Sequence, residues 1–182
     1  MLFIHQLPAD CVNKKLFQSA IHALEAGNIG VALSKSKQLI EADPKDPYGL
    51  VLAADCFSFY GKEQEVLLLL QAAVDASEHA PIYSLLHSQQ LHRMQLSAQS
   101  LDCVCEALRR QPSDSGLLLM QFELLCFLKK DREACSLVES SRGKLINHPD
   151  FHSLVIALYR RLGENQKALA EAQDWSNERS SC

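Results

Sequence analysis

Residues 16–44, LFQSAIHALEAGNIGVALSKSKQLIEADP, carry the pattern that decides the fold. Apolar residues recur at steps of three and four, which is the spacing of one face of a helix. Gly27 interrupts this pattern near the middle, and glycine commonly ends a helix because it adopts a left-handed backbone conformation. Asp43 and Pro44 close the second segment, since proline breaks a helix beyond its first turn. We therefore expect two helices joined by a short turn.

The same pattern returns every 34 residues. Five frames fill the chain to Cys182 without an insertion, after an N-terminal segment of residues 1–12. The frames are residues 13–46, 47–80, 81–114, 115–148 and 149–182. Their fifteenth place is occupied by Gly27, Gly61, Gln95, Lys129 and Gly163. Such a fixed period predicts an array of repeated supersecondary units.

Proline and small residues define the expected hairpins further. Pro47, Pro81 and Pro149 begin their frames and predict helix starts there, because proline is tolerated in the first turn of a helix. Small residues at the eighth and twentieth places allow two antiparallel helices to approach closely. These pairs are Ala20 with Ala32, Ala54 with Val66, and Ser88 with Ser100. Each frame is thus expected to form a hairpin of two helices of roughly 14 residues each.

The composition agrees with an all-α fold. The chain has 30 Leu and 19 Ala, but only 8 Val, 7 Ile and no Thr. Helices favour Leu and Ala, whereas strands favour β-branched residues. We therefore expect about ten antiparallel helices and no strand of useful length.

The frames resemble the tetratricopeptide repeat family over about 170 of the 182 residues. The first frame matches best, and the third and fourth depart from the pattern because they lack the central glycine. The resemblance implies a right-handed superhelical solenoid that recognises proteins in a concave groove and is not an enzyme. Five places of each frame would project into that groove. From these places the predicted partner-binding residues are Phe17, Ile21, Tyr48, Val51, Asp55, Phe59, Leu85, Gln89, Leu119, Glu123, Phe127 and Arg160.

The predicted lining is apolar through four frames and basic in the fifth. One subfamily holds acidic chaperone tails with a clamp of Lys, Asn and Arg, but apolar residues occupy those places here, so we exclude that function. An apolar groove is suited to a hydrophobic or amphipathic protein segment instead. Phe17, Tyr48, Phe59 and Phe127 are the candidate anchors, because large aromatic residues supply much interface energy. A Phe or Leu at helical spacing is, however, more often part of the core than of a groove.

Two functions remain open at this point. The chain could be a small chaperone or adaptor of the kind that serves secretion systems, which is an analogy with the family. Alternatively it could be a self-associating scaffold subunit, a homo-oligomer with the groove filled by its own N-terminus. The segment Met1–Leu2–Phe3–Ile4 is apolar and could pack over the first helix or dock into a neighbouring chain.

Charge and cysteine content exclude several other classes. The net charge is -4, so no field attracts nucleic acid. The chain has no apolar run long enough for a membrane span and no secretory signal. Seven irregularly spaced cysteines indicate reduced thiols in a cytoplasmic protein. We find no catalytic motif, no cofactor motif and no metal-ligand set, and therefore expect catalytic sites, cofactors and metal sites to be absent.

Overall fold

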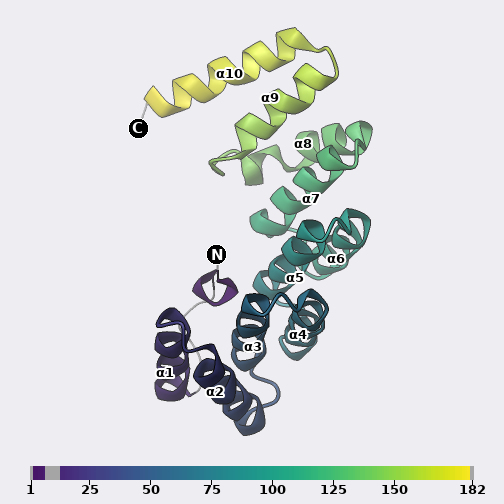
Figure 1. Ribbon diagram of the computed structural model, residues 1–182. Helices are drawn as coiled ribbons and strands as arrows, with labels where there is room; N and C mark the ends of the chain where they lie inside the picture. Colours follow the sequence, from purple (N-terminus) through teal and green to yellow (C-terminus); the bar gives the residue numbers. More distant parts are fainter. Residues whose placement is uncertain (1, 7–12, 181–182) are drawn as a thin grey trace. The chain divides into compact units, whose positions relative to one another are not determined.

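The computed structural model describes residues 2–6 and 13–180, and this part of the chain contains helices and no strand (Figure 1). The expected all-α fold is confirmed. A short 3-10 helix, η1 (Phe3–Gln6), precedes ten α-helices. These are α1 (Lys14–Glu25), α2 (Ile29–Ala42), α3 (Pro47–Phe59), α4 (Glu63–Ala76), α5 (Pro81–Arg93), α6 (Ser97–Arg110), α7 (Ser115–Phe127), α8 (Asp131–Leu145), α9 (Phe151–Arg161) and α10 (Asn165–Ser180).

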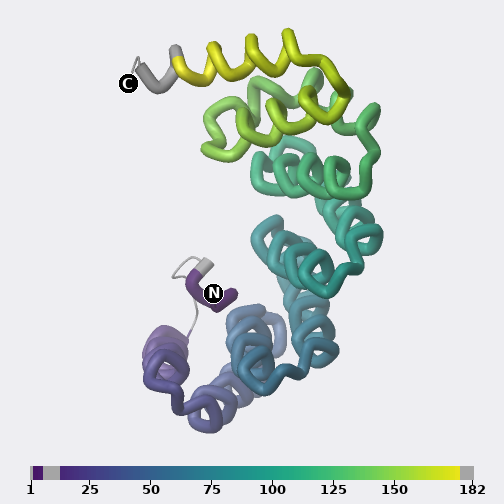
Figure 2. Tube along the Cα trace, turned by 45° about the horizontal axis from the view of Figure 1, so that its top comes forward, coloured from purple at the N-terminus to yellow at the C-terminus, as the bar shows by residue number. Residues whose placement is uncertain are grey.

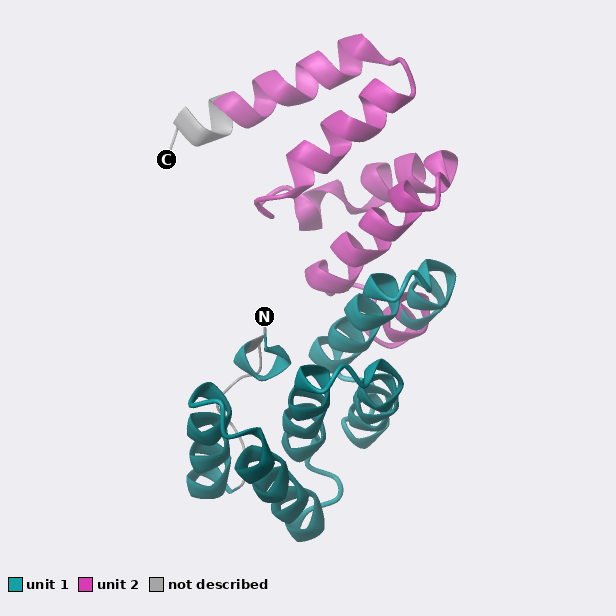
Figure 3. Ribbon diagram, viewed as in Figure 1, with its two compact units in different colours: residues 1–103 teal, residues 104–182 magenta. Residues whose placement is uncertain are grey.

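Two compact units divide the chain, residues 1–103 and residues 104–182 (Figure 3). The boundary falls inside α6. The first unit holds η1, α1 to α5 and the beginning of α6. The second unit holds the end of α6 and α7 to α10. Within each unit, consecutive helices follow one another as hairpins, which the Cα trace makes clear (Figure 2).

The turn inside every hairpin repeats one backbone arrangement with the 34-residue period. Gly27, Gly61 and Gly163 have φ values of 77°, 65° and 75°. Gln95 and Lys129 occupy the same place in their frames and adopt φ values of 63° and 57° without being glycine. Because L-residues other than glycine are strained in this region, these two turns are formed against local preference.

A hydrogen bond closes each of these turns in the same way. The N–H of the sixteenth place donates to the carbonyl of the eleventh, as from Asn28 to Ala23 at 2.8 Å and from Lys130 to Leu125 at 2.9 Å. The three other frames contain the equivalent bond. This is the Schellman arrangement, which satisfies a carbonyl that the helix end leaves unpaired. The turn is therefore fixed in all five frames, including the two without glycine.

The small residues expected between paired helices are buried in the first unit. Ala20, Ala32 and Ala54 are fully buried. Ser88 and Ser100 are also fully buried, and their hydroxyl oxygens lie 2.8 Å apart between α5 and α6. The Ser100 hydroxyl additionally donates to the Ser88 carbonyl at 2.8 Å. In the third frame this pair of hydroxyl groups thus takes the place of the alanine methyl groups, and α5 and α6 remain close together.

A further close approach joins α2 to α3 at Gly49. A Cβ atom placed on Gly49 would lie 3.1 Å from the backbone nitrogen of Ile40 and 3.0 Å from the Cβ of Leu39. Real Cβ atoms rarely come this near to backbone, so a side chain at this position would push α2 and α3 apart by a few tenths of an ångström, and the close spacing between frames favours glycine. Sequence analysis did not identify this position.

One predicted helix start is wrong. Pro47 and Pro81 begin α3 and α5 as expected, but α9 begins at Phe151 and not at Pro149. Pro149 lies in a turn, which the Phe151 N–H closes by donating to the His148 carbonyl at 3.1 Å. The first helix of each hairpin, which we name the inner helix, has 11 to 13 residues, and the second, which we name the outer helix, has 14 to 16. The expected equal lengths are therefore only approximate.

The last hairpin contains a buried ionic cluster. Glu171 of α10 lies 2.7 Å from the Nδ1 atom of His152 on α9 and accepts from Arg142 of α8 at 2.8 Å. Glu171 and His152 are 4% and 2% exposed. The Trp175 ring stacks on the His152 ring at 5.9 Å. Since a buried charge is costly without partners, this cluster specifies how α10 packs on its neighbours.

Candidate functional site

The first unit binds its own N-terminal segment. The short helix η1 contacts α3. Figure 1 shows η1 near α1 and α3 of the same unit. Phe3 and Ile4 are 4% and 3% exposed and belong to the hydrophobic core of this unit. Apolar residues at the beginning of the chain are therefore part of the first unit's packing.

Asp55 holds this segment by its main chain. The N–H of Phe3 donates to Asp55 Oδ1 at 2.7 Å, and the N–H of Ile4 donates to Oδ2 at 2.8 Å. These are the first two residues of η1, and N–H groups in the first turn of a helix have no partner within the helix. His5 adds a longer contact, with its Nε2 atom 3.8 Å from Glu25 of α1. Both oxygens of the Asp55 carboxylate thus accept hydrogen bonds from the first turn of η1.

The surroundings of Asp55 are apolar. Tyr48, Val51 and Asp55 share one face of α3, because they are spaced three and four residues apart. They are 7%, 0% and 1% exposed. Phe17 of α1 packs edge-on against Tyr48 with ring centroids 5.2 Å apart. We call Phe17, Tyr48, Val51 and Asp55 the Asp55 seat.

Burial of Asp55 alters its proton affinity. Its pKa is raised from 3.8 to about 6, because burial disfavours the charged form, while the hydrogen bonds from Ile4 and Phe3 act in the opposite direction. The direction indicates that burial outweighs the two hydrogen bonds. Nearby N–H groups therefore stabilise the charged form of this carboxylate against the effect of burial.

Approximate free-energy contributions indicate what holds η1 in place. Burying two large apolar side chains contributes about 3–6 kcal/mol. Ordering the backbone of four residues costs about 4–8 kcal/mol. These terms nearly cancel. The two hydrogen bonds to the carboxylate, worth about 1.5–3 kcal/mol each, are opposed by the cost of burying the charged form of Asp55. Docking of η1 is thus weak enough to be reversible.

The structure places the predicted groove residues in three environments. Four of them form the Asp55 seat in the first unit. Ile21, Leu85, Gln89 and Glu123 are half-buried, and Leu119 is buried at 7% exposure. Phe59 and Phe127 are 56% and 61% exposed, and Arg160 is exposed as well. Phe17 and Tyr48 are therefore packed inside the first unit, whereas Phe59 and Phe127 present large aromatic surface.

Glu123 of the second unit occupies the same place in its frame as Asp55, 68 residues further along. Burial raises its pKa, and the charge of Asp150 raises it further. Phe59 and Phe127 likewise share one place, so the sequence Asp-x-x-x-Phe of α3 recurs as Glu-x-x-x-Phe in α7. The second and fourth frames thus repeat one combination of a carboxyl group whose pKa burial raises and an exposed ring.

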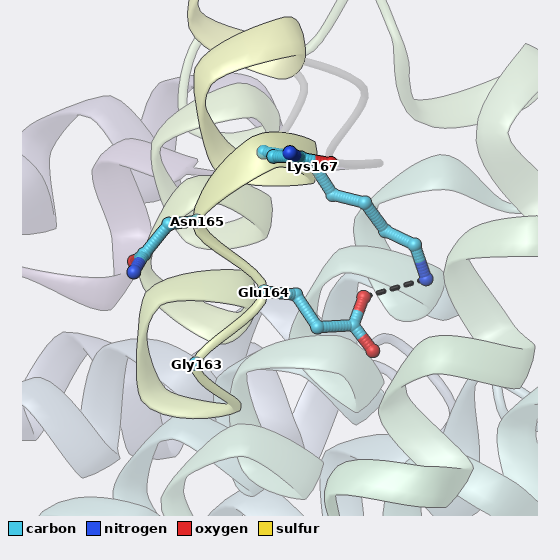
Figure 4. Close-up of a pocket in the computed structure, with 5 residues that line it drawn as sticks. Gly163, Glu164, Asn165 and Lys167 are labelled. Carbon is cyan, nitrogen blue, oxygen red and sulfur yellow. Dashed lines mark ion pairs between the residues drawn. The ribbon is translucent and has the colours of Figure 1, made fainter.

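The second unit also contains hollows. One of about 390 Å³ lies at the turn between α9 and α10 and is lined by residues 163–167, among which Lys167 pairs with Glu164 (Figure 4). The described residues that line it come from one short stretch of chain. Within the described residues, no group of His, Cys, Asp or Glu could hold a metal ion. The described helices are all too short or too polar to cross a membrane.

Sequence reasoning missed the pairing of Asp55 with the N-terminus. It placed Asp55 in the groove and left open whether the N-terminal segment fills that groove. A signal was present, because an acidic residue stands alone among apolar neighbours in Leu50–Cys56. The backbone donors that satisfy it could not be read from side-chain patterns.

The arrangement defines the class of the fold as a helical-hairpin repeat array of the tetratricopeptide type. Solved structures similar to the chain agree. MamA from Desulfovibrio magneticus RS-1 superposes with a TM-score of 0.72 at 14% identity, over 91% of this chain and 95% of that one. TTC0263, a thermophilic tetratricopeptide protein of Thermus thermophilus, gives 0.61 at 18% identity over 90% and 89%.

A third similar structure is YrrB, described as a tetratricopeptide protein with an unusual peptide-binding site. Its TM-score is 0.65 at 15% identity, over 92% of this chain and 86% of that one. No family model and no curated protein sequence matches the chain. At these identities the likeness establishes the tetratricopeptide-repeat fold, which the sequence predicted.

Proposed function

We propose that the chain is a non-catalytic protein-interaction module that binds a hydrophobic or amphipathic protein segment against the inner helices of its hairpins. The observation that carries this proposal is the seating of the chain's own apolar segment on α3, through Asp55 and the residues around it. A surface that accepts one apolar segment has the chemistry to accept another. The peptide-binding description of YrrB is consistent with this use of the fold.

A small adaptor or chaperone in the cytoplasm is the form of this function that we favour. Cys56, Cys103, Cys105, Cys126 and Cys135 are free. Burial raises the pKa of Cys56 and Cys103 to about 11, so these thiols stay protonated and unreactive. Free, inert cysteines support a reducing compartment.

Exposed aromatic residues provide the experiment. Phe59 lies at the end of the inner helix α3, and Leu68 is 72% exposed on the outer helix α4 of the same hairpin. Partners are captured on the immobilised full-length chain from the native cell and identified by mass spectrometry. We expect Phe59→Glu to abolish recovery of a partner that Leu68→Glu still recovers, while both variants keep wild-type helicity by circular dichroism. Equal recovery by both variants would contradict binding at the inner helices.

A self-associating scaffold subunit is the second candidate. It is supported by the short N-terminal contact, since a segment held by few residues can exchange between copies. Removal of residues 1–9 should then change the mass that light scattering measures. A monomer both before and after removal would eliminate this candidate.

A further inference from the structure

The Asp55 seat has a narrower chemistry than an apolar surface alone. Both carboxylate oxygens accept main-chain N–H groups from two successive residues, Phe3 and Ile4. Successive N–H groups free of internal partners occur at the first turn of a helix. The partial positive charge at that end also complements a carboxylate. The charge of His5 also acts on Asp55, but the groups that donate hydrogen bonds to both carboxylate oxygens are backbone N–H groups, so the seat is matched to backbone.

The apolar part of the seat adds a second requirement. Asp55 is 1% exposed, and Val51 is fully buried on the same face of α3. Phe3 and Ile4, which supply the N–H groups, are themselves buried by this packing. A ligand that offered N–H groups without large apolar side chains would leave unfilled the places in the hydrophobic core that Phe3 and Ile4 occupy.

The chain's own segment is a tethered competitor for this site. Seven residues separate Gln6 from Lys14, where α1 begins. A short tether of this kind holds a ligand at an effective concentration in the millimolar range. Any outside segment that binds the Asp55 seat must first displace η1.

We propose, on the basis of the function above, that the Asp55 seat binds the first helical turn of a partner protein, in which two successive residues are large and apolar. Residues 2–6 imitate that turn and keep the seat closed until the partner displaces them. The N-terminal segment is thus an internal inhibitor whose sequence describes the ligand.

The test uses the full-length chain and a fluorescent peptide with the sequence Leu2–Gln6, acetylated at its N-terminus. Phe3→Ser/Ile4→Pro undocks the tethered segment, because it removes both apolar side chains and the Ile4 N–H. We expect the peptide to bind this undocked variant at least about tenfold more tightly than the wild-type chain in fluorescence anisotropy, since the tethered competitor is lost. Adding Asp55→Asn to the undocked variant should weaken binding at least about tenfold.

Two controls separate recognition from general damage. Asp102→Asn in the undocked variant removes an exposed carboxylate from α6 and should leave peptide affinity unchanged. A peptide with proline at the position of Ile4 keeps most of the apolar surface but lacks one N–H, and should bind at least about tenfold more weakly to any folded chain. This second comparison also works on the wild-type chain if the undocked variant does not fold.

The proposal is overturned if the proline peptide binds as well as the original, or if the undocked variant gains no affinity while remaining folded. It is also overturned if wild-type dimers that dissociate in the undocked variant appear in light scattering, because the occupant would then be a second copy. Partner capture that depends on Phe59 would survive each of these failures, so the broader function is tested separately.

Discussion

Asp55 makes the stability of the first unit depend on pH, and Asp55→Asn should remove that dependence. The wild-type carboxyl has a pKa of about 6 in the folded chain, against 3.8 for an ordinary Asp. The folded state therefore holds this proton more tightly than the unfolded state does. The stabilisation from the bound proton is present below pH 3.8 and is lost as the pH rises through 6.

The magnitude follows from the size of this shift. Each pKa unit corresponds to about 1.4 kcal/mol. Between about pH 4.5 and pH 7 the Asp55 contribution to the free energy of unfolding should fall by about 2 kcal/mol, because the full shift of about two units is not spanned. Since Asp55 is almost completely buried, solvent screening reduces this figure little.

Urea denaturation followed by circular dichroism in the far ultraviolet provides the assay. Free energies of unfolding for the wild-type chain and Asp55→Asn are measured over the same pH range in one buffer mixture. We expect the wild-type advantage over the variant to shrink by about 2 kcal/mol across this range. Titrating groups distant from Asp55 are present in both proteins and cancel in the difference, whereas His5 and the N-terminal amino group interact with the Asp55 charge and belong to the measured contribution.

A constant difference between the two proteins across this range would refute the reasoning. It would mean that the Asp55 carboxyl is not shielded from water in the folded chain. A difference that grows with pH would have the wrong sign, and would indicate that hydrogen bonds from η1 outweigh burial.

Three further predictions concern the fold. Gly49→Ala should destabilise the chain by about 1–3 kcal/mol in urea denaturation, because the new methyl group meets the backbone of α2. The matched change Gly30→Ala, whose methyl group meets nothing within 4 Å, should stabilise the chain by about 0.5–1 kcal/mol, and equal effects of the two changes would contradict the close approach. Lys129→Gly should stabilise the chain by about 1 kcal/mol by relieving its positive φ, and a lower denaturation midpoint would count against this. Glu171→Gln should cost about 2 kcal/mol through the loss of charge in the α8–α10 cluster; a change below about 0.5 kcal/mol would show that the cluster contributes little.

Much of the fold could be predicted because the repeat is recorded in residue types. Glycine at Gly27 indicates a helix end, and the paired small residues Ala20 and Ala32 indicate a close approach of two helices. Proline at Pro47 indicates either a helix start or a turn. The third and fourth frames were harder, since Gln95 and Lys129 reach a glycine conformation through the hydrogen bond that closes the turn. That bond belongs to the backbone and leaves no trace in the side-chain pattern.

The candidate site was less predictable for a related reason. Periodicity places Tyr48, Val51 and Asp55 on one face of α3, but it could not tell whether that face meets a partner or the chain itself. The answer depends on the long-range contact from Phe3 and Ile4 to Asp55, which spans more than 50 residues. Pro149 failed for a local reason, because a turn and a first helical turn accept proline equally well.

Trp175 has a use that its packing on His152 creates. It is the only tryptophan of the chain. Its ring lies nearly parallel to the imidazole, at an angle of 12°, and that imidazole contacts Glu171. The indole emission therefore reports on the last hairpin without any attached dye, and separation of α10 from α9 will change its intensity and wavelength. Stopped-flow mixing with detection of Trp175 fluorescence can therefore measure how fast α10 separates from α9 and packs on it again.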